Sequence, residues 1–319
     1  MMADWLQRIS SDPKTFTAKG GTELMRDALY EYTKLSEYEN INLVLSTPDI
    51  NKIKYTKHNL LWQHLSYTDE SLGALRDPAF MKAINSQVYV SHWQYEKFRY
   101  IYQIPLENAY VIKNAIVPIE HKEKSKDGKL KLIYASTPFR GLDILLDVFE
   151  LLNRDDIELD VYSSTAVYGS GYAQHVGNQY EMLFDRARNM PGVNYHCYGS
   201  NEQIRKAMQE AHILSYPSIF EETSCLVMIE AGAAGCSLVT TNLGALYETG
   251  TEYAKMIEVQ ADRDIIVRNY AKALEQEIDN YWNTSNQEML KKQSEYFNTF
   301  YSWEKRSKEW NNLFDRISS

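Results

Sequence analysis

Two glutamates eight positions apart, Glu222 and Glu230, lie in the part of the sequence with the most candidate chemistry, residues 215–249 (SYPSIFEETSCLVMIEAGAAGCSLVTTNLGALYET). The pattern of this stretch predicts a strand, a loop, a helix, a second strand and a second loop, with Thr223 or Ser224 as the N-cap of the helix. The backbone N–H groups that begin such a helix suit phosphate oxygens. At about 1.5 Å per residue, the two carboxylates are separated by at most ~12 Å along the axis. That separation matches the span from the ribose to the far sugar of a nucleoside diphosphate sugar.

The two glutamates also have an ordinary explanation, in which Glu222 is a solvated loop acid and Glu230 a salt-bridged helix residue. Arg140 has a chemical logic of its own, since it follows a predicted strand, 130–136, and precedes a predicted helix, 141–152. A diphosphate leaving group gains negative charge as its bond to a sugar breaks. An arginine and a helix N-terminus can stabilise that charge without a metal. A surface arginine at a helix start is the alternative.

The first half of the chain offers a histidine and a glycine pair. His64 ends an apolar predicted strand, 59–65, where a side chain directed at a ligand site is expected, although a structural histidine is the alternative. Gly20 and Gly21 open a predicted helix, 20–34, and glycine lets a backbone approach a phosphate or an acceptor closely. A plain loop-to-helix junction fits the glycine pair equally well.

Composition excludes several classes of function. The chain has 319 residues, a formal net charge of −9 and only short cationic clusters, so nucleic acid is not expected as the main ligand. The three cysteines occur singly, without the spacing of a zinc site or a disulfide framework, which indicates a reducing, cytoplasmic setting. The sequence has no signal peptide and no run of 18 apolar residues, so any membrane association would be peripheral.

The elements that must position these residues alternate along the whole chain. In the first half, strands are predicted at 41–46, 59–65, 87–91 and 109–116, and helices at 20–34 and 93–102. In the second half, strands are predicted at 130–136, 157–163, 193–199, 212–216, 237–241 and 256–260, each separated by a helical pattern. An aromatic helical region follows at 286–316, in which Ser302 is a candidate cap at a break.

Regular alternation of strands and helices predicts parallel sheets covered on both faces, and such sheets bind ligands at the carboxyl ends of their strands. The charged stretch 121–129, which contains an Asp-Gly turn pair, is the best candidate for a linker. We therefore expect an α/β protein with two Rossmann-like domains facing each other across a cleft. The predicted domains are 1–120, a short acceptor domain, and 121–290, a donor domain, with 291–319 as a terminal helix that packs back toward the first domain.

Here the sequence resembles a known family. FEETSCLVMIEAGAAGCSLVTTNLGALYET closely resembles the Glu-x7-Glu segment of the family 4 retaining glycosyltransferases of GT-B fold, and KLKLIYASTPFRGLDILLDVF, 129–149, resembles the family's first donor-domain strand and phosphate loop in a Ser/Thr-Pro-x-Arg-Gly-Leu variant. AYVIKNAIVP, KGGTEL, LLWQHLSYTDES and YSWEKRSKEWNNLF resemble further family segments in the right order. The resemblance covers nearly the whole chain from about residue 19.

The resemblance implies a role for each candidate residue. Glu230 would hold the donor ribose, while Glu222 and His64 would contact the donor sugar and Arg140 its diphosphate. The implied catalytic residues are therefore His64, Glu222 and Arg140. The implied donor-binding residues are Glu230, Ser136, Thr137, Thr223, Ser224, Cys225, Leu226, Gly199 and Gly21.

The resemblance further implies a metal-independent, retaining transfer of a hexose-type sugar from a nucleoside diphosphate sugar to a hydroxyl acceptor, which is a glycan, a lipid-linked saccharide or a protein. No cofactor is expected. The alternatives are a non-catalytic nucleotide- or sugar-binding protein on the same fold, and a GT-B epimerase or phosphorylase. The DxD sequence at Asp262–Asp264, a metal-binding signature in another glycosyltransferase fold, is interpreted as a helix cap.

The sequence departs from the family pattern in two places. Many relatives place a second cation a few residues before the position of Arg140, where this chain has Ser136 and Thr137. Hydroxyls and backbone N–H groups would then have to neutralise the second phosphate charge. Relatives also begin with a strand before the glycine loop, whereas residues 2–18 do not have a strand pattern, so the first domain is expected to be short.

Overall fold

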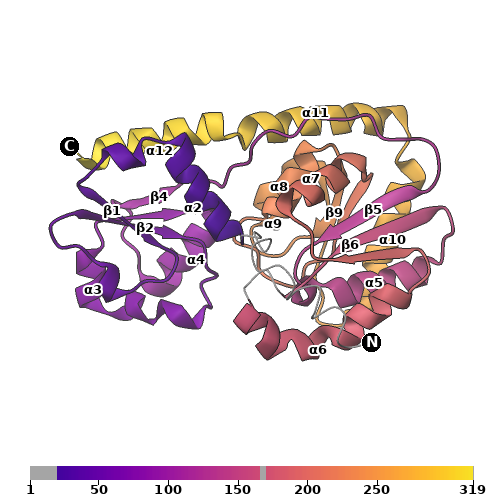
Figure 1. Ribbon diagram of the computed structural model, residues 1–319, viewed down its shortest axis with the longest axis horizontal. Helices are drawn as coiled ribbons and strands as arrows, with labels where there is room; N and C mark the ends of the chain where they lie inside the picture. Colours follow the sequence, from indigo (N-terminus) through magenta and orange to yellow (C-terminus); the bar gives the residue numbers. More distant parts are fainter. Residues whose placement is uncertain (1–19, 166–169, 319) are drawn as a thin grey trace.

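The computed structural model describes residues 20–165 and 170–318, which form two α/β domains lying side by side (Figure 1). Each domain is built on one parallel sheet, of four strands in the N-terminal domain and six in the C-terminal domain. Residues 2–18, for which no strand was predicted, lie outside the described part of the chain. No described helix is both long enough and apolar enough to cross a membrane.

The N-terminal sheet has the strand order β1-β2-β3-β4. Its strands are β1 (Ile41–Leu45), β2 (His58–Gln63), β3 (Ser86–Tyr89) and β4 (Ala109–Val111). Its helices are α2 (Gly21–Tyr32), α3 (Pro78–Ala83) and α4 (His92–Tyr102), with short 3-10 turns at η1 (Leu35–Glu37), η2 (Ile50–Lys52) and η3 (Glu70–Arg76). Both faces of the sheet are covered, as the apolar strand sequences predict for parallel strands.

The C-terminal sheet has the order β10-β9-β8-β5-β6-β7. Strands β5, β6 and β7 follow one another toward one edge of the sheet, and β8, β9 and β10 toward the other, so the strand order reverses between β5 and β8. The strands are β5 (Leu130–Ala135), β6 (Ile157–Tyr162), β7 (Val193–Cys197), β8 (Ile213–Tyr216), β9 (Ser237–Thr241) and β10 (Ala254–Ile257). The helices are α5 (Leu142–Leu152), α6 (Ser170–Asn189), α7 (Asn201–Glu210), α8 (Leu226–Ala233), α9 (Leu246–Gly250), α10 (Arg263–Asn280), α11 (Thr284–Phe300) and α12 (Trp303–Ser318), with 3-10 turns η4 (Pro138–Arg140) and η6 (Thr251–Tyr253).

The chain crosses from one domain core to the other twice, as the clusters of buried apolar residues show. Residues from Ile116 to Tyr301 form the C-terminal core, whereas Trp303, Trp310 and Phe314 of α12 join the core of the N-terminal domain. Figure 1 shows α11 over the C-terminal domain and α12 continuing over the N-terminal domain. The N-terminal core is therefore assembled from both ends of the described chain.

The two crossing points are hydrogen-bonded to each other. The amide of Ile116 donates to the Tyr301 carbonyl at 2.8 Å, and the amide of Trp303 donates to the Ile116 carbonyl at 3.2 Å. The predicted strand 109–116 is therefore too long: β4 ends at Val111, because the chain then leaves the sheet to reach α11 and α12. The break between these helices lies at Ser302, whose hydroxyl accepts the Lys305 amide at 3.2 Å.

The small residues that follow Glu230 pack mainly against α11. Gly232 of α8 lies directly against the ring of Phe297, and the Ser294 hydroxyl donates to the Ala233 carbonyl at 2.6 Å. These contacts with α11 anchor the α8 helix from its outer side.

A carboxylate of the C-terminal domain caps a helix of the N-terminal domain. The side chain of Glu248, on α9, accepts the first two amides of α4, those of His92 and Trp93, both at 3.0 Å. It also bonds to the His92 ring at 2.8 Å and pairs with the ammonium of Lys113. Burial raises the pKa of Glu248, but the bonds from Lys113, His92 and Trp93 outweigh burial and lower this pKa to about 2. The carboxylate therefore ties the two domains together only while it is ionised.

Glu248→Gln is expected to lower the free energy of unfolding by roughly 2–3 kcal/mol at pH 7, because the folded carboxyl has a pKa of about 2 against an ordinary value of 4.5. A depressed pKa stabilises the folded protein above pH 4.5, and this stabilisation is lost as the pH falls toward 2. Urea unfolding of both proteins at several pH values measures the difference, which should shrink across that window.

The matched control is Glu252→Gln, at an exposed glutamate of the neighbouring turn η6. This variant should stay within about 0.5 kcal/mol of the parent at every pH. Equal stabilities for Glu248→Gln and Glu252→Gln would show that the Glu248 carboxylate does not hold the domains together.

Candidate active site

The ends of β5 and β8 lie next to each other, at the point where the strand order of the C-terminal sheet reverses. In open parallel sheets this is the place where ligands bind, just beyond the carboxyl ends of the strands. The loop after β5 carries Ser136, Thr137 and Arg140, and the loop after β8 carries Glu222. Sequence candidates from both loops are thus brought to one edge of the sheet.

Gly141 allows the two loops to touch. Its φ is +103°, and a Cβ atom at this position would lie 2.1 Å from the carbonyl oxygen of Pro217. No larger residue fits that approach, because both the left-handed backbone and the neighbouring carbonyl exclude a side chain. The glycine of the phosphate-loop motif thus fixes Arg140 beside the loop that follows β8.

Arg140 and Glu222 form an ion pair in which the carboxylate is buried and the guanidinium partly exposed. The Arg140 Nη1 atom lies 2.9 Å from Oε1 of Glu222, whose side chain is only 5% exposed. The hydroxyl of Tyr216 donates to the same oxygen at 2.6 Å and lies 3.3 Å from the Ser136 hydroxyl. The Arg140 guanidinium also lies over the ring of Phe220, 4.7 Å from its centroid. Of the two sequence interpretations of Glu222, a solvated loop acid is therefore wrong.

The second glutamate, Glu230, has its own arginine. Nε and Nη2 of Arg205, on α7, both contact Oε1 of Glu230, at 2.8 and 2.7 Å. Oε2 has no hydrogen-bond partner among the described residues. Burial raises the pKa of Glu230 above its ordinary value, and the charge of Arg205 and its hydrogen bond offset this rise only in part. The salt-bridged interpretation holds for one oxygen, and the other oxygen remains available to a ligand hydroxyl.

The α8 helix begins at Leu226, but its N-cap differs from the prediction. Its N-cap is Cys225, and no side chain caps the helix start, so the N-cap assignments to Thr223 and Ser224 are wrong. Both residues lie in the loop before the helix. The Thr223 hydroxyl instead donates to the backbone carbonyl of His64 at 3.0 Å, which joins the α8 loop to the end of β2 in the other domain. Burial raises the pKa of the Cys225 thiol, so the N-cap residue is neutral.

Two helices, one from each domain, begin at the interdomain junction, where the α8 loop contacts the end of β2. Leu226, the first residue of α8, lies against Gly21, the first residue of α2, with its Cδ1 atom 3.1 Å from where a Cβ of Gly21 would be. Neither helix has a side-chain cap. Two sets of first-turn amides and two positive helix ends therefore lie close together, an arrangement that attracts anions.

His64 lies at the same junction with an unsatisfied ring nitrogen. Its ring packs on Trp62 at a centroid distance of 4.4 Å, and its Nε2 atom is buried without a hydrogen-bond partner. Burial lowers the pKa of His64 to about 3, so the imidazole is neutral at physiological pH. A buried polar atom without a partner is costly, and a ligand that supplies one removes this cost.

The remaining sequence candidates lie around the ends of β5 and β7. The Thr137 hydroxyl is also buried without a partner. Ser136 reaches the ion pair through Tyr216, as described above. Gly199 follows β7 and lies directly against the ring of Tyr162. It is separated from the Arg140–Glu222 pair by β6 in the sheet order.

Sequence reasoning missed four residues of this region: Tyr216, Arg205, Glu248 and Lys113. The position of Tyr216 at the end of a predicted strand was the one available signal, since strand ends point to the ligand edge. The DxD sequence is a helix cap as interpreted, because Asp262 accepts the Asp264 amide at 2.8 Å at the start of α10. Within residues 20–165 and 170–318, no three His, Cys, Asp or Glu side chains are grouped as metal ligands would be.

A model of the family described as Glycosyl transferases group 1 matches residues 118–296. The matched region includes the loops after β5 and β8 and the two glutamates, Glu222 and Glu230. No curated protein matches the sequence.

Solved structures have the same fold at low sequence identity. Sucrose-phosphate synthase from Thermosynechococcus elongatus is 14% identical with a TM-score of 0.67. The matched region covers 97% of this chain and 82% of the synthase chain. HepE of Anabaena, solved in complex with UDP-glucose, is 12% identical with a TM-score of 0.63, covering 99% and 90%. TarM is 17% identical with a TM-score of 0.63, covering 90% of this chain, which spans 57% of TarM. With two parallel-sheet domains, the chain has the GT-B fold that was predicted.

Gly141→Ala is expected to lower the free energy of unfolding by more than about 2 kcal/mol, because the new Cβ would meet the Pro217 carbonyl at a strained φ. Gly73→Ala is the matched control, since a Cβ at Gly73 meets nothing within 4 Å. That control should change stability by less than about 0.5 kcal/mol, as judged by chemical unfolding. If the two variants were equally stable, the contact between the loops after β5 and β8 would not be tight.

Proposed function

The chain belongs to the group 1 glycosyl transferases, and we propose that it moves a hexose-type sugar from a nucleoside diphosphate sugar to a hydroxyl-bearing acceptor. The observation that supports this most directly is the convergence of Arg140, the uncapped start of α8 and the buried Nε2 atom of His64 at the interdomain junction. These groups supply what a departing diphosphate and a reacting sugar require.

Arg140 and the α8 start act on the diphosphate in this proposal. Negative charge accumulates on the leaving group as the glycosidic bond breaks, and fixed donors already in place stabilise that charge without reorganising. The pair with Glu222 holds the guanidinium in position before the donor arrives. The unpartnered Thr137 hydroxyl adds a donor where relatives have a second cation, so the transfer needs no metal.

Glu230 binds the donor ribose in this proposal. Arg205 occupies Oε1, which leaves Oε2 to accept bonds from ribose hydroxyls. Burial raises the pKa of Glu230, and the contact with Arg205 partly offsets that rise in favour of the ionised carboxylate, which is the stronger acceptor.

His64 contacts the donor sugar in this proposal. A neutral imidazole can donate or accept one hydrogen bond at Nε2 without adding a positive charge next to an oxocarbenium-like sugar. Glu222, buried in its pair with Arg140, lies on the opposite side of the junction from His64, joined to it through the Thr223 hydroxyl bond. Among the described residues, Glu222 pairs with Arg140 and Tyr216 rather than with a second acid, so paired-carboxylate hydrolysis is not the proposed chemistry.

The test is the release of nucleoside diphosphate from UDP-glucose, UDP-N-acetylglucosamine and GDP-mannose, measured with and without EDTA. HepE was solved with UDP-glucose, so the uridine donors are tried first. Slow release that persists in EDTA is expected. Abolition by EDTA would reject metal independence, and saturable binding of a donor with no release would identify a non-catalytic binding protein.

Glu230→Gln is expected to weaken binding of the active donor by about 1–3 kcal/mol, through loss of charge-assisted bonds to the ribose. Titration calorimetry with the donor and with its nucleoside diphosphate measures the loss, which should be equal for both, since both carry the ribose. Glu275→Gln, at an exposed glutamate of α10, is the matched control and should bind normally. Unchanged donor affinity in Glu230→Gln would remove this residue from the site.

A further inference from the structure

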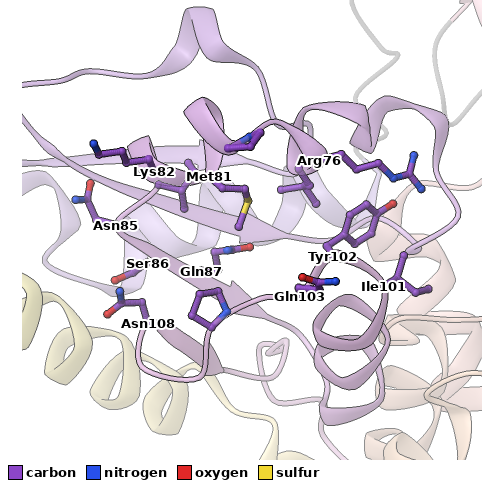
Figure 2. Close-up of a pocket in the computed structure, with 14 residues that line it drawn as sticks. Arg76, Met81, Lys82, Asn85, Ser86, Gln87, Ile101, Tyr102, Gln103 and Asn108 are labelled. Carbon is purple, nitrogen blue, oxygen red and sulfur yellow. The ribbon is translucent and has the colours of Figure 1, made fainter.

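The N-terminal domain has a cavity of about 650 Å³ at the edge of its sheet opposite the candidate active site. Its lining includes Asn85 and Ser86 at the start of β3 and Asn108 just before β4 (Figure 2). His64 follows the opposite, carboxyl end of the neighbouring strand β2. In a parallel sheet these edges are separated by the length of the strands, so the cavity is not part of the active site.

The floor of this cavity is a buried carboxamide with an unused donor. Gln87 on β3 is 5% exposed, and its Oε1 atom accepts the Tyr89 hydroxyl at 2.8 Å. That bond fixes the orientation of the amide, and its Nε2 group has no acceptor among the described residues. Figure 2 shows Gln87 between Lys82 and Asn85 on one side and Arg76 and Tyr102 on the other. A buried N–H group directed into a cavity indicates a ligand that supplies an acceptor.

Three further side chains around the cavity offer donors. The Oδ1 atom of Asn85 already accepts the Asn59 amide at 2.7 Å, which leaves the Asn85 amino group for a ligand. The Arg76 guanidinium lies over the ring of Tyr102, 5.4 Å from its centroid, and Lys82 is exposed at the opposite side. Two cations and two amide donors on one cavity, in a chain with a net charge of −9, favour an anionic ligand rich in acceptors.

We propose that this cavity binds an acidic saccharide, as a second contact for the acceptor chain that the active site extends. The carboxamides would bond to sugar hydroxyls, the two cations to carboxylate groups, and the apolar side chains of Met81 and Pro105 would pack on a sugar ring. The volume suits one or two sugar units. The assignment of the saccharide as acceptor rests on the proposed transferase function, but binding at the cavity does not require turnover.

The experiment is a calorimetric titration of the full chain with hexagalacturonate, an acidic oligosaccharide, and with maltohexaose, its neutral counterpart. Hexagalacturonate should bind at least about tenfold more tightly, because only it carries carboxylates for the two cations. Arg76→Glu should weaken its binding about tenfold or more. Gln87→Glu, which keeps the bond from Tyr89 but replaces the amide donor, should weaken it similarly.

Arg268→Glu makes the same charge change on α10, at an exposed arginine remote from the cavity, and should alter the affinity less than about twofold. Melting temperatures identify any variant that fails to fold, and Arg76, being exposed, carries the test if Gln87→Glu does not. Absence of hexagalacturonate binding, or equal binding by Arg76→Glu and Arg268→Glu, would overturn the proposal. Binding without any donor turnover would uphold the saccharide site while refuting the transferase function.

Discussion

The ion pair between Arg140 and Glu222 is the interaction on which the candidate site depends. It joins the loops after β5 and β8, which come from separate halves of the C-terminal sheet. Removing two charges from water is costly, and their attraction offsets that cost only where further bonds satisfy the carboxylate. The Tyr216 hydroxyl provides such a bond. The pair therefore serves mainly to orient the Arg140 guanidinium at the ligand-binding edge of the C-terminal sheet, rather than to stabilise the fold.

Apart from the contact of Leu226 with Gly21, the contacts described between the domains are polar, whereas each domain core is apolar. Thr223 meets the backbone of His64, and Glu248 meets the start of α4 and Lys113. Contacts of this kind, few and hydrogen-bonded, are typical of domains that can move relative to each other. The break at Ser302, where α11 gives way to α12, lies beside the crossing at Ile116, so both connections between the domains pass through one place.

Most of the fold could be predicted from the sequence, because alternation of apolar runs and amphipathic stretches is a local property that a parallel sheet preserves. The ends of elements could not: Thr223 has the side chain of an N-cap, but its hydroxyl bonds across the domain junction instead. The partners in ion pairs between distant positions could not be predicted either. Arg205 and Glu230 are 25 positions apart and Lys113 and Glu248 are 135 apart, so only the folded chain brings them together.

The packing of α12 on the N-terminal domain has a consequence for how the protein is made. Trp303, Trp310 and Phe314 belong to the core of the domain whose strands are synthesised first. During translation this face of the sheet is covered only in part, by α2 residues such as Met25 and Leu29, until the whole C-terminal domain has been produced. The domain that begins first is thus completed last, and its exposed face is a natural target for a chaperone in the interval.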